Sequence, residues 1–245
     1  MNVPHNPRLW ALTFAAFGLT GQAATAHGIW IAESHSNLAV IYGHGASDEA
    51  YDPAKLTSLR GCDAAGACAD IISEPLPTHV EIARPAGMTL LSATFDNGYW
   101  SKDAAGEWQN LPKTEVPGAT EGGQYLKYTT YVLDHLTLPV TPAGLTLEIV
   151  PMADPMTLSA GDILTVQVLF HGVPAVGAEV IADYVNDGDA APVLTDADGM
   201  AQIVVRNQGQ NVLAVSMSET PADLTLADEV GHTATLAFSL MHGEE

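Results

Sequence analysis

The chain has 245 residues, of which 47% are hydrophobic and 15% are charged. Its 29 acidic residues outnumber 8 basic ones, for a formal net charge of −21. Such a charge repels nucleic acid and anionic lipid headgroups and favours cations near the surface, so we expect no nucleic-acid partner.

The first 26 residues have the features of a cleavable secretory signal. Arg8 precedes an apolar run, residues 9–19, that is too short to span a bilayer. Ala24-Thr25-Ala26 then fits the small-x-small pattern after which a signal peptidase cleaves. An uncleaved anchor is the alternative. We expect cleavage, export to the periplasm and a mature chain that begins at His27.

The remaining sequence is typical of an all-β protein. Short β-branched or aromatic runs are separated by clusters of Gly, Pro, Asn and Asp, and helical periodicity is almost absent. The run 163–170 alternates imperfectly, which predicts a central strand buried on both faces. In chain order, the predicted strands are residues 38–42, 79–83, 89–95, 125–131, 145–149, 163–170, 179–184, 201–205, 211–216 and 233–240.

A proline-rich stretch, residues 141–155, predicts a linker or a strand passed between two domains. The sequence after it has the length of one immunoglobulin-like sandwich. We therefore expect two β-sandwich-type domains: an N-terminal β domain with a metal site (27–145) and a C-terminal immunoglobulin-like β-sandwich (146–245). Within the second, residues 195–201 predict a tight turn, because the later acidic ligands of a calcium loop are missing.

Cys62 and Cys68 are the only cysteines in the sequence. An even number in an exported chain favours one disulfide, which here would close a short loop of Gly, Ala and Asp. A metal clip made of two thiolates is the alternative.

The predicted mature N-terminus is the most informative feature for chemistry. A chain that starts at His27 carries a free α-amine and an imidazole on one residue, and such groups lose their protons near neutral pH. Together they can chelate one metal ion, and a second histidine would complete a nitrogen-rich site suited to copper, nickel or cobalt. The alternative is that cleavage leaves a histidine first by chance.

His44 is the strongest candidate for the second ligand. It follows a predicted strand and lies between Gly43 and Gly45, which let the backbone bend and expose the imidazole at a sheet rim. His35 is a weaker alternative in a loop. Asp134-His135 could supply a further ligand or a carboxylate that orients one. Each of these histidines can also be read as an ordinary loop or surface residue.

Motifs of enzymes are absent from the sequence. It contains no Gly-x-Ser-x-Gly, no His-Glu-x-x-His and no phosphate-binding glycine-rich loop. We therefore expect a protein that is not an enzyme.

The chain resembles domain-of-unknown-function family 4198, exported proteins often labelled NikK-like periplasmic components of nickel/cobalt transport systems. The similarity extends through most of the mature sequence, and its most specific segments are Glu148-Ile149-Val150-Pro151 and Asp196-Ala197-Asp198-Gly199. The resemblance implies a two-part β protein. It also implies that His27 and His44 lie at the family's histidine positions, whereas His171 departs mildly from its pattern.

These features lead to one main hypothesis and two alternatives. The main hypothesis is a periplasmic metal-binding accessory protein that captures a nickel or cobalt ion for a membrane permease. The preference for nickel or cobalt over copper rests on the resemblance alone. One alternative is a copper-binding protein, or a copper monooxygenase with an N-terminal histidine brace. The other is a metal-free β-sandwich interaction module.

Overall fold

The computed structural model describes residues 27–34 and 37–240, and this part of the chain is built from strands. The all-β prediction, with sheets packed as in β-sandwiches, is confirmed. The predicted signal segment (1–26) and His35 lie outside the described residues. Short 3-10 helices occur at Pro53–Lys55, Lys113–Glu115 and Pro155–Thr157. Within the described ranges, none of the helices is long and apolar enough to cross a membrane.

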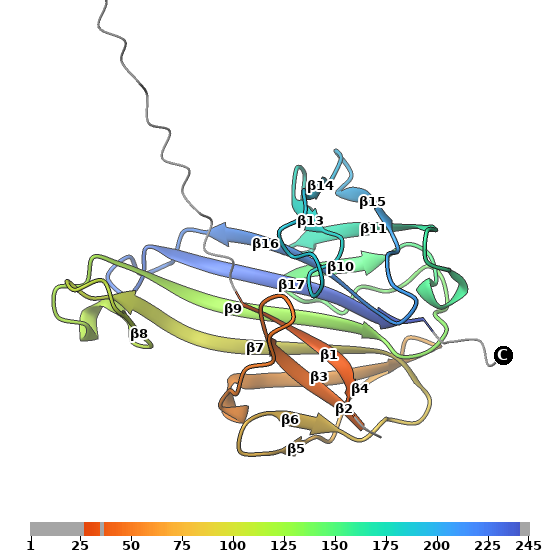
Figure 1. Ribbon diagram of the computed structural model, residues 1–245, viewed down its shortest axis with the longest axis horizontal. Coiled ribbons are helices and arrows are strands. Elements are labelled where there is room, and N and C mark those ends of the chain that lie inside the picture. The colour runs from red at the N-terminus through yellow and green to blue at the C-terminus, as the bar shows by residue number, and fades with distance from the viewer. Residues whose placement is uncertain (1–26, 35–36, 241–245) are drawn as a thin grey trace, which may run out of the picture.

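The largest sheet runs through the middle of the molecule (Figure 1). Its pairs are antiparallel except β9 and β17, which are parallel neighbours although they come from opposite sides of residue 145. The two-domain division and the immunoglobulin-like class of the second part stay predictions, but strands of both parts share this sheet. In spatial order it contains β14 (Val193–Leu194), β13 (Glu179–Ile181), β16 (Gln210–Glu219), β17 (Glu229–Ser239), β9 (Glu121–Val132), β7 (Met88–Lys102), β3 (Leu56–Asp63) and β4 (Cys68–Asp70), with β8 (Trp108–Gln109) on β7.

Two smaller sheets pack on opposite faces of the large one. One contains β1 (Gly28–Ser34), β2 (Asn37–Gly43), β6 (Val80–Ile82) and β5 (Glu74–Pro75). The other contains β10 (Leu147–Pro151), β11 (Ile163–Phe170), β12 (Val173–Pro174) and β15 (Met200–Val204). Each interface holds its own hydrophobic core, so the described chain forms three layers.

The strands buried on both faces belong to the large sheet, as β17 shows, and do not include residues 163–170. Leu236 packs in one core and Ala237 in the other, because successive side chains of a strand point to opposite faces. The prediction for residues 163–170 was correct in bounds and in central position, but wrong in burial. Leu164 and Val166 are fully buried, whereas Ile163 is 49% exposed, since β11 belongs to an outer layer.

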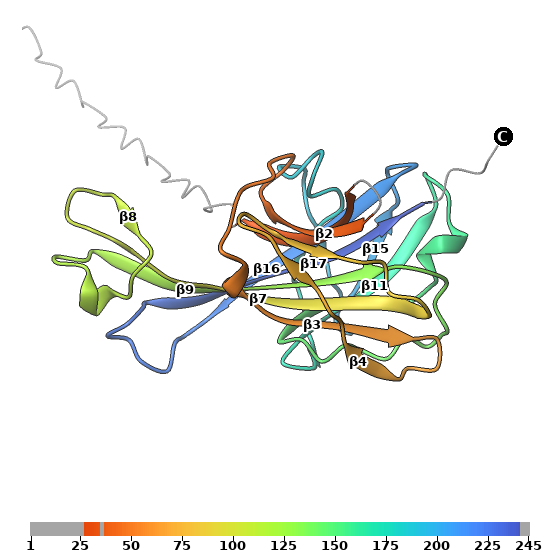
Figure 2. The same ribbon diagram turned by 90° about the horizontal axis from the view of Figure 1, so that it is seen from below.

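The long strands β7, β9, β16 and β17 extend beyond the two small sheets (Figure 2). We call this extension, residues 97–125 and 217–231, the arm. A bulge in the pairing of β7 with β9, between Asp96 and Tyr99, marks its base. There Gly98 has a φ of 75°, and the Asp96 carboxylate accepts from its amide at 2.8 Å.

The two segments that carry the family resemblance have structural roles. Glu148 is buried, and its carboxylate accepts hydrogen bonds from the amides of Ala143 (2.6 Å), Gly144 (3.0 Å) and Leu145 (3.3 Å), which holds the proline-rich loop against β10. Burial raises the pKa of Glu148. The predicted turn is confirmed, because Asp196 accepts from the amides two and four residues later, at 2.9 Å each.

Candidate functional site

The β1–β2 hairpin brings the two predicted histidine ligands to one place. The last pair of its ladder is Gly28 opposite Gly43. His27 directly precedes Gly28 and His44 directly follows Gly43, so both leave the ladder at the same end. The antiparallel register therefore explains why residues 17 positions apart in sequence come together.

The side chain of Tyr184, which comes from the second half of the chain, contacts both strands at this end of the hairpin. Its buried hydroxyl accepts from the amide of Gly28 at 2.9 Å and donates to the carbonyl of Gly43 at 3.1 Å. Burial raises the pKa of Tyr184 to about 12, so the phenol keeps its proton at neutral pH. The Nδ1 atom of His44 lies 3.4 Å from the same hydroxyl.

The His27 ring is oriented by two neighbours. It stacks on Tyr42 with the ring centres 5.2 Å apart, and its Nε2 lies 2.8 Å from a carboxylate oxygen of Glu49. Because an ionised carboxylate only accepts, Nε2 is the donor, and in the neutral imidazole Nδ1 then carries the lone pair. Nδ1 is the ring nitrogen nearer the main chain, so it can act together with the α-amine of the same residue. Carboxylates orient metal-binding histidines in this way.

Lys127, from the middle of β9, fixes the main chain of His27. Its side chain is buried, and its ammonium donates to the carbonyl oxygen of His27. Burial, with a smaller contribution from repulsion by Lys55, lowers the pKa of Lys127 to about 8. His27 is therefore held through its ring by Glu49 and through its main chain by Lys127.

His44 occupies a tight turn, as predicted from its glycines. Its amide donates to the Ser47 hydroxyl at 2.7 Å, and its carbonyl accepts from the Ser47 amide at 3.1 Å. A side chain at position 43 would place Cβ 2.2 Å from the Ser47 carbonyl oxygen, and Gly45 has a φ of 58°. Both glycines are therefore required by the backbone.

His135 lies elsewhere. It follows β9 at the end away from His27, and the strand from Lys127 to Val132 alone spans roughly 17 Å. The Nδ1 atom of His135 lies 2.7 Å from a carboxylate oxygen of Asp154, and this hydrogen bond raises the pKa of His135. Asp134 accepts a hydrogen bond from the main-chain amide of His135. The structure does not bring His135 to the other two, and its role as a ligand stays a prediction.

The donors at the hairpin end fit a nitrogen-rich site. Among residues 27–34 and 37–240, no group of three or more His, Cys, Asp or Glu side chains is arranged to hold a metal ion. A metal there would take its nitrogens from His27, through Nδ1 and the α-amine of the mature chain, and from His44. Nitrogen donors of this kind suit nickel, cobalt and copper.

A wide groove begins beside His27 and continues along the arm, with a volume of about 1210 Å³. We call it the arm groove. His27, Tyr42 and Lys127 line it near the hairpin, and Trp100, Trp108 and Tyr125 line it along the arm. Sequence reasoning missed this groove, together with Tyr184, Glu49 and Lys127, because all of them depend on contacts between distant segments.

The family comparison covers most of the described structure. The model of a domain of unknown function, DUF4198, matches residues 24–219. The chain belongs to the DUF4198 family. The matched range includes His27, His44 and Tyr184. No curated protein matches the chain.

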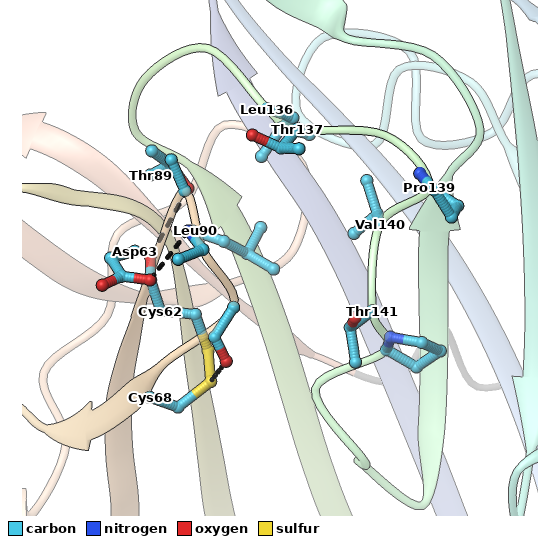
Figure 3. A pocket seen from close by; sticks show the side chains of 14 residues that line it. Cys62, Asp63, Cys68, Thr89, Leu90, Leu136, Thr137, Pro139, Val140 and Thr141 are labelled. Carbon is cyan, nitrogen blue, oxygen red and sulfur yellow. Dashed lines mark hydrogen bonds between the residues drawn. A yellow bond between two sulfur atoms is a disulfide. The ribbon is translucent and has the colours of Figure 1, made fainter.

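The DUF4198 chain has a smaller cavity, of about 140 Å³, between the β3–β4 hairpin and residues 136–142 (Figure 3). Cys62 and Cys68 lie on one side of it, and Thr137, Pro139 and Val140 on the other. The predicted disulfide between the two cysteines is confirmed, and no free cysteine occurs in the described part of the chain. Because both sulfurs are in the disulfide, they do not form a thiolate metal clip.

A second histidine cluster of this DUF4198 protein lies beside the β16–β17 hairpin, where the His232 ring packs on Tyr128 and Phe170. Glu219 bridges two histidines, with one oxygen 2.9 Å from His171 Nε2 and the other 3.2 Å from His232 Nε2. The His171 hydrogen bond lowers the pKa of Glu219, and burial lowers the pKa of His232. The cluster ties the turn after β11 to the β16–β17 hairpin. His171 has a left-handed φ of 51°, and its ring reaches Glu219.

Proposed function

We propose that this DUF4198 protein is an exported metal-binding accessory protein, which captures Ni(II) or Co(II) at His27 and His44 for a membrane uptake transporter. One observation carries the proposal. His27 and His44 flank the Gly28–Gly43 pair, so both histidines lie at the same end of the β1–β2 hairpin. Glu49 holds Nε2 of His27, which leaves Nδ1 for the metal.

Export supplies the third nitrogen. Cleavage after Ala26 gives His27 a free α-amine, and an amine and Nδ1 on one residue form a chelate with a single ion. The same event places the protein in the periplasm, where an uptake system meets its cargo. The acidic surface favours the approach of cations.

The choice of cargo rests on the resemblance to nickel/cobalt transport components, since nitrogen donors alone also suit copper. Copper binding with an N-terminal histidine brace is therefore the second candidate. The orientation of His27 by Glu49 favours copper binding as much as nickel or cobalt binding. The mature protein can separate these possibilities, because a copper monooxygenase is redox-active and a nickel carrier is not.

The test is a metal competition. The full-length chain is expressed with export, mass spectrometry verifies that the mature form begins at His27, and the protein is dialysed against equal concentrations of Ni(II), Co(II) and Cu(II). We expect about one equivalent of nickel or cobalt to remain bound in the presence of a competing chelator. Bound copper with reductant-dependent oxidase activity would instead support the monooxygenase, and retention of no metal would support the interaction module.

A further inference from the structure

Two lysines of the arm groove differ from every other described basic residue. Lys55 donates to the side-chain oxygens of Asn97 (2.9 Å) and Asn110 (3.3 Å), and Lys127 donates to a main-chain carbonyl. Among residues 27–34 and 37–240, neither forms an ion pair. All other lysines and arginines in those ranges do: Arg60 with Asp70, Arg84 with Glu33, Lys102 with Glu121, Lys113 with Asp228 and Arg206 with Asp187.

This difference matters because acidic residues greatly outnumber basic ones. A chain with 29 acidic residues could readily supply carboxylates to all its cations. The two ammonium groups that bond only neutral oxygens line the same groove, and both can still attract an anion. Lysine ammonium groups in a sheltered groove are suited to carboxylate recognition.

The acidic residues of the groove hydrogen-bond to other groups, although the charges of Asp52 and of nearby Asp96 act on Lys55. Glu49 is bonded to His27, and Asp52 accepts from the amide of Ala54 at 3.0 Å. Glu229, on the arm, lies 3.5 Å from the Tyr125 hydroxyl. None of the three forms an ion pair with Lys55 or Lys127.

Aromatic rings supply the apolar part of the groove. Trp108 is 44% exposed, and the indole N–H of Trp100 donates to the Asn97 carbonyl at 3.1 Å, which fixes its ring. The Lys55 ammonium lies 5.8 Å from the Trp100 ring centre. A flat apolar face beside a cation matches a ligand with a hydrocarbon body and an acidic end.

The size of the groove points to an organic molecule. Its volume of about 1210 Å³ is above the roughly 300–1,000 Å³ typical of small-molecule sites, so it has room for an organic molecule and far exceeds the space of a bare ion. We propose that the arm groove binds a small organic carboxylic acid, with its carboxylates at Lys55 and Lys127 and its body on Trp100 and Trp108. The use of this site, to present the cargo to His27 as a metal–carboxylate chelate, rests on the proposed function.

The first part of the test is metal-free. Mature protein treated with a chelator and dialysed is titrated by calorimetry and tryptophan fluorescence with citrate and with benzene-1,2-dicarboxylate. We expect at least one acid to bind at millimolar concentrations or below. Lys55→Met should weaken it roughly tenfold, the loss of one charge-assisted hydrogen bond. Lys113→Met, which removes the same charge from an ion pair with Asp228, should leave the affinity unchanged.

The proposal is overturned if neither acid binds, or if Lys55→Met and Lys113→Met behave alike. Lys127→Met tests the second lysine in the same acid titration. Circular dichroism shows whether each variant is folded. A second titration with Ni(II) alone and with Ni(II)–citrate separates the two claims. Acid binding without nickel binding would support the groove site and contradict the proposed function. Nickel binding without acid binding would support the proposed function and contradict the groove site.

Discussion

The hydroxyl of Tyr184 accepts a hydrogen bond from the amide of Gly28 at 2.9 Å, although 156 residues separate them in the chain. The same oxygen donates to Gly43, so one side chain holds both strands of the hairpin where His27 and His44 leave it. The position of the candidate ligands therefore depends on the second half of the chain.

Replacement of Tyr184 tests this dependence. Tyr184→Phe leaves the Gly28 amide and the Gly43 carbonyl without the phenol, and one buried unpaired group costs about 1–3 kcal/mol. We expect the free energy of unfolding in urea to fall by that amount and Ni(II) affinity to fall with it. Tyr99→Phe is the matched control, because the Tyr99 hydroxyl has no hydrogen-bond partner among the described residues. Equal stability of the two variants would contradict the role of Tyr184.

The buried carboxylate of Glu148 should be among the most sensitive positions outside the site. Glu148→Ala removes the acceptor of three amides in residues 143–145, and we expect a loss of about 3 kcal/mol in unfolding free energy. Glu179→Ala, at an exposed strand position, should change it by less than about 0.5 kcal/mol. A loss at Glu148 no larger than this would show that the loop does not depend on the carboxylate.

The Glu219 bridge predicts a specific pH dependence. Its hydrogen bond to His171 lowers the pKa of Glu219 in the folded state, so its stabilisation is present above the usual glutamate pKa and is lost as pH falls through the lowered one. Because the pair is partly exposed, Glu219→Gln should cost at most about 1 kcal/mol near pH 6.

That difference between the wild type and Glu219→Gln should close as pH falls below about 4, measured by urea unfolding across the range. Glu74→Gln serves as the control, since Glu74 is exposed in β5 and forms no ion pair among the described residues. A difference that widened on acidification would contradict the assignment.

The local part of this fold was predictable from sequence. The bounds of β11 were predicted correctly, because its hydrophobic run ends in clear turn signals. The strand predicted at 89–95 is longer, Met88–Lys102, because Asp96-Asn97-Gly98 has the composition of a turn but forms a bulge inside a continuing strand. Turn composition describes backbone conformation and cannot tell a chain reversal from a bulge.

Only some residues of the candidate site could be predicted from the sequence. His27 and His44 were predicted from the cleavage pattern and the glycines, which are local signals. Glu49 and Tyr184 could not be, since their roles arise from loop geometry and from the packing of distant segments. The parallel pairing of β9 with β17, which places Lys127 under His27, likewise has no local signature.

In the proposed site, His27 binds a metal ion through its own α-amine and together with His44. Calorimetric titration of Ni(II) into mature protein tests it directly, beside a form with one alanine before His27, His44→Ala, and His79→Ala as control. We predict one site in the wild type and in His79→Ala, with affinity at least roughly tenfold lower in the other two, because each loses one nitrogen ligand. Identical titrations of all four proteins would contradict the account.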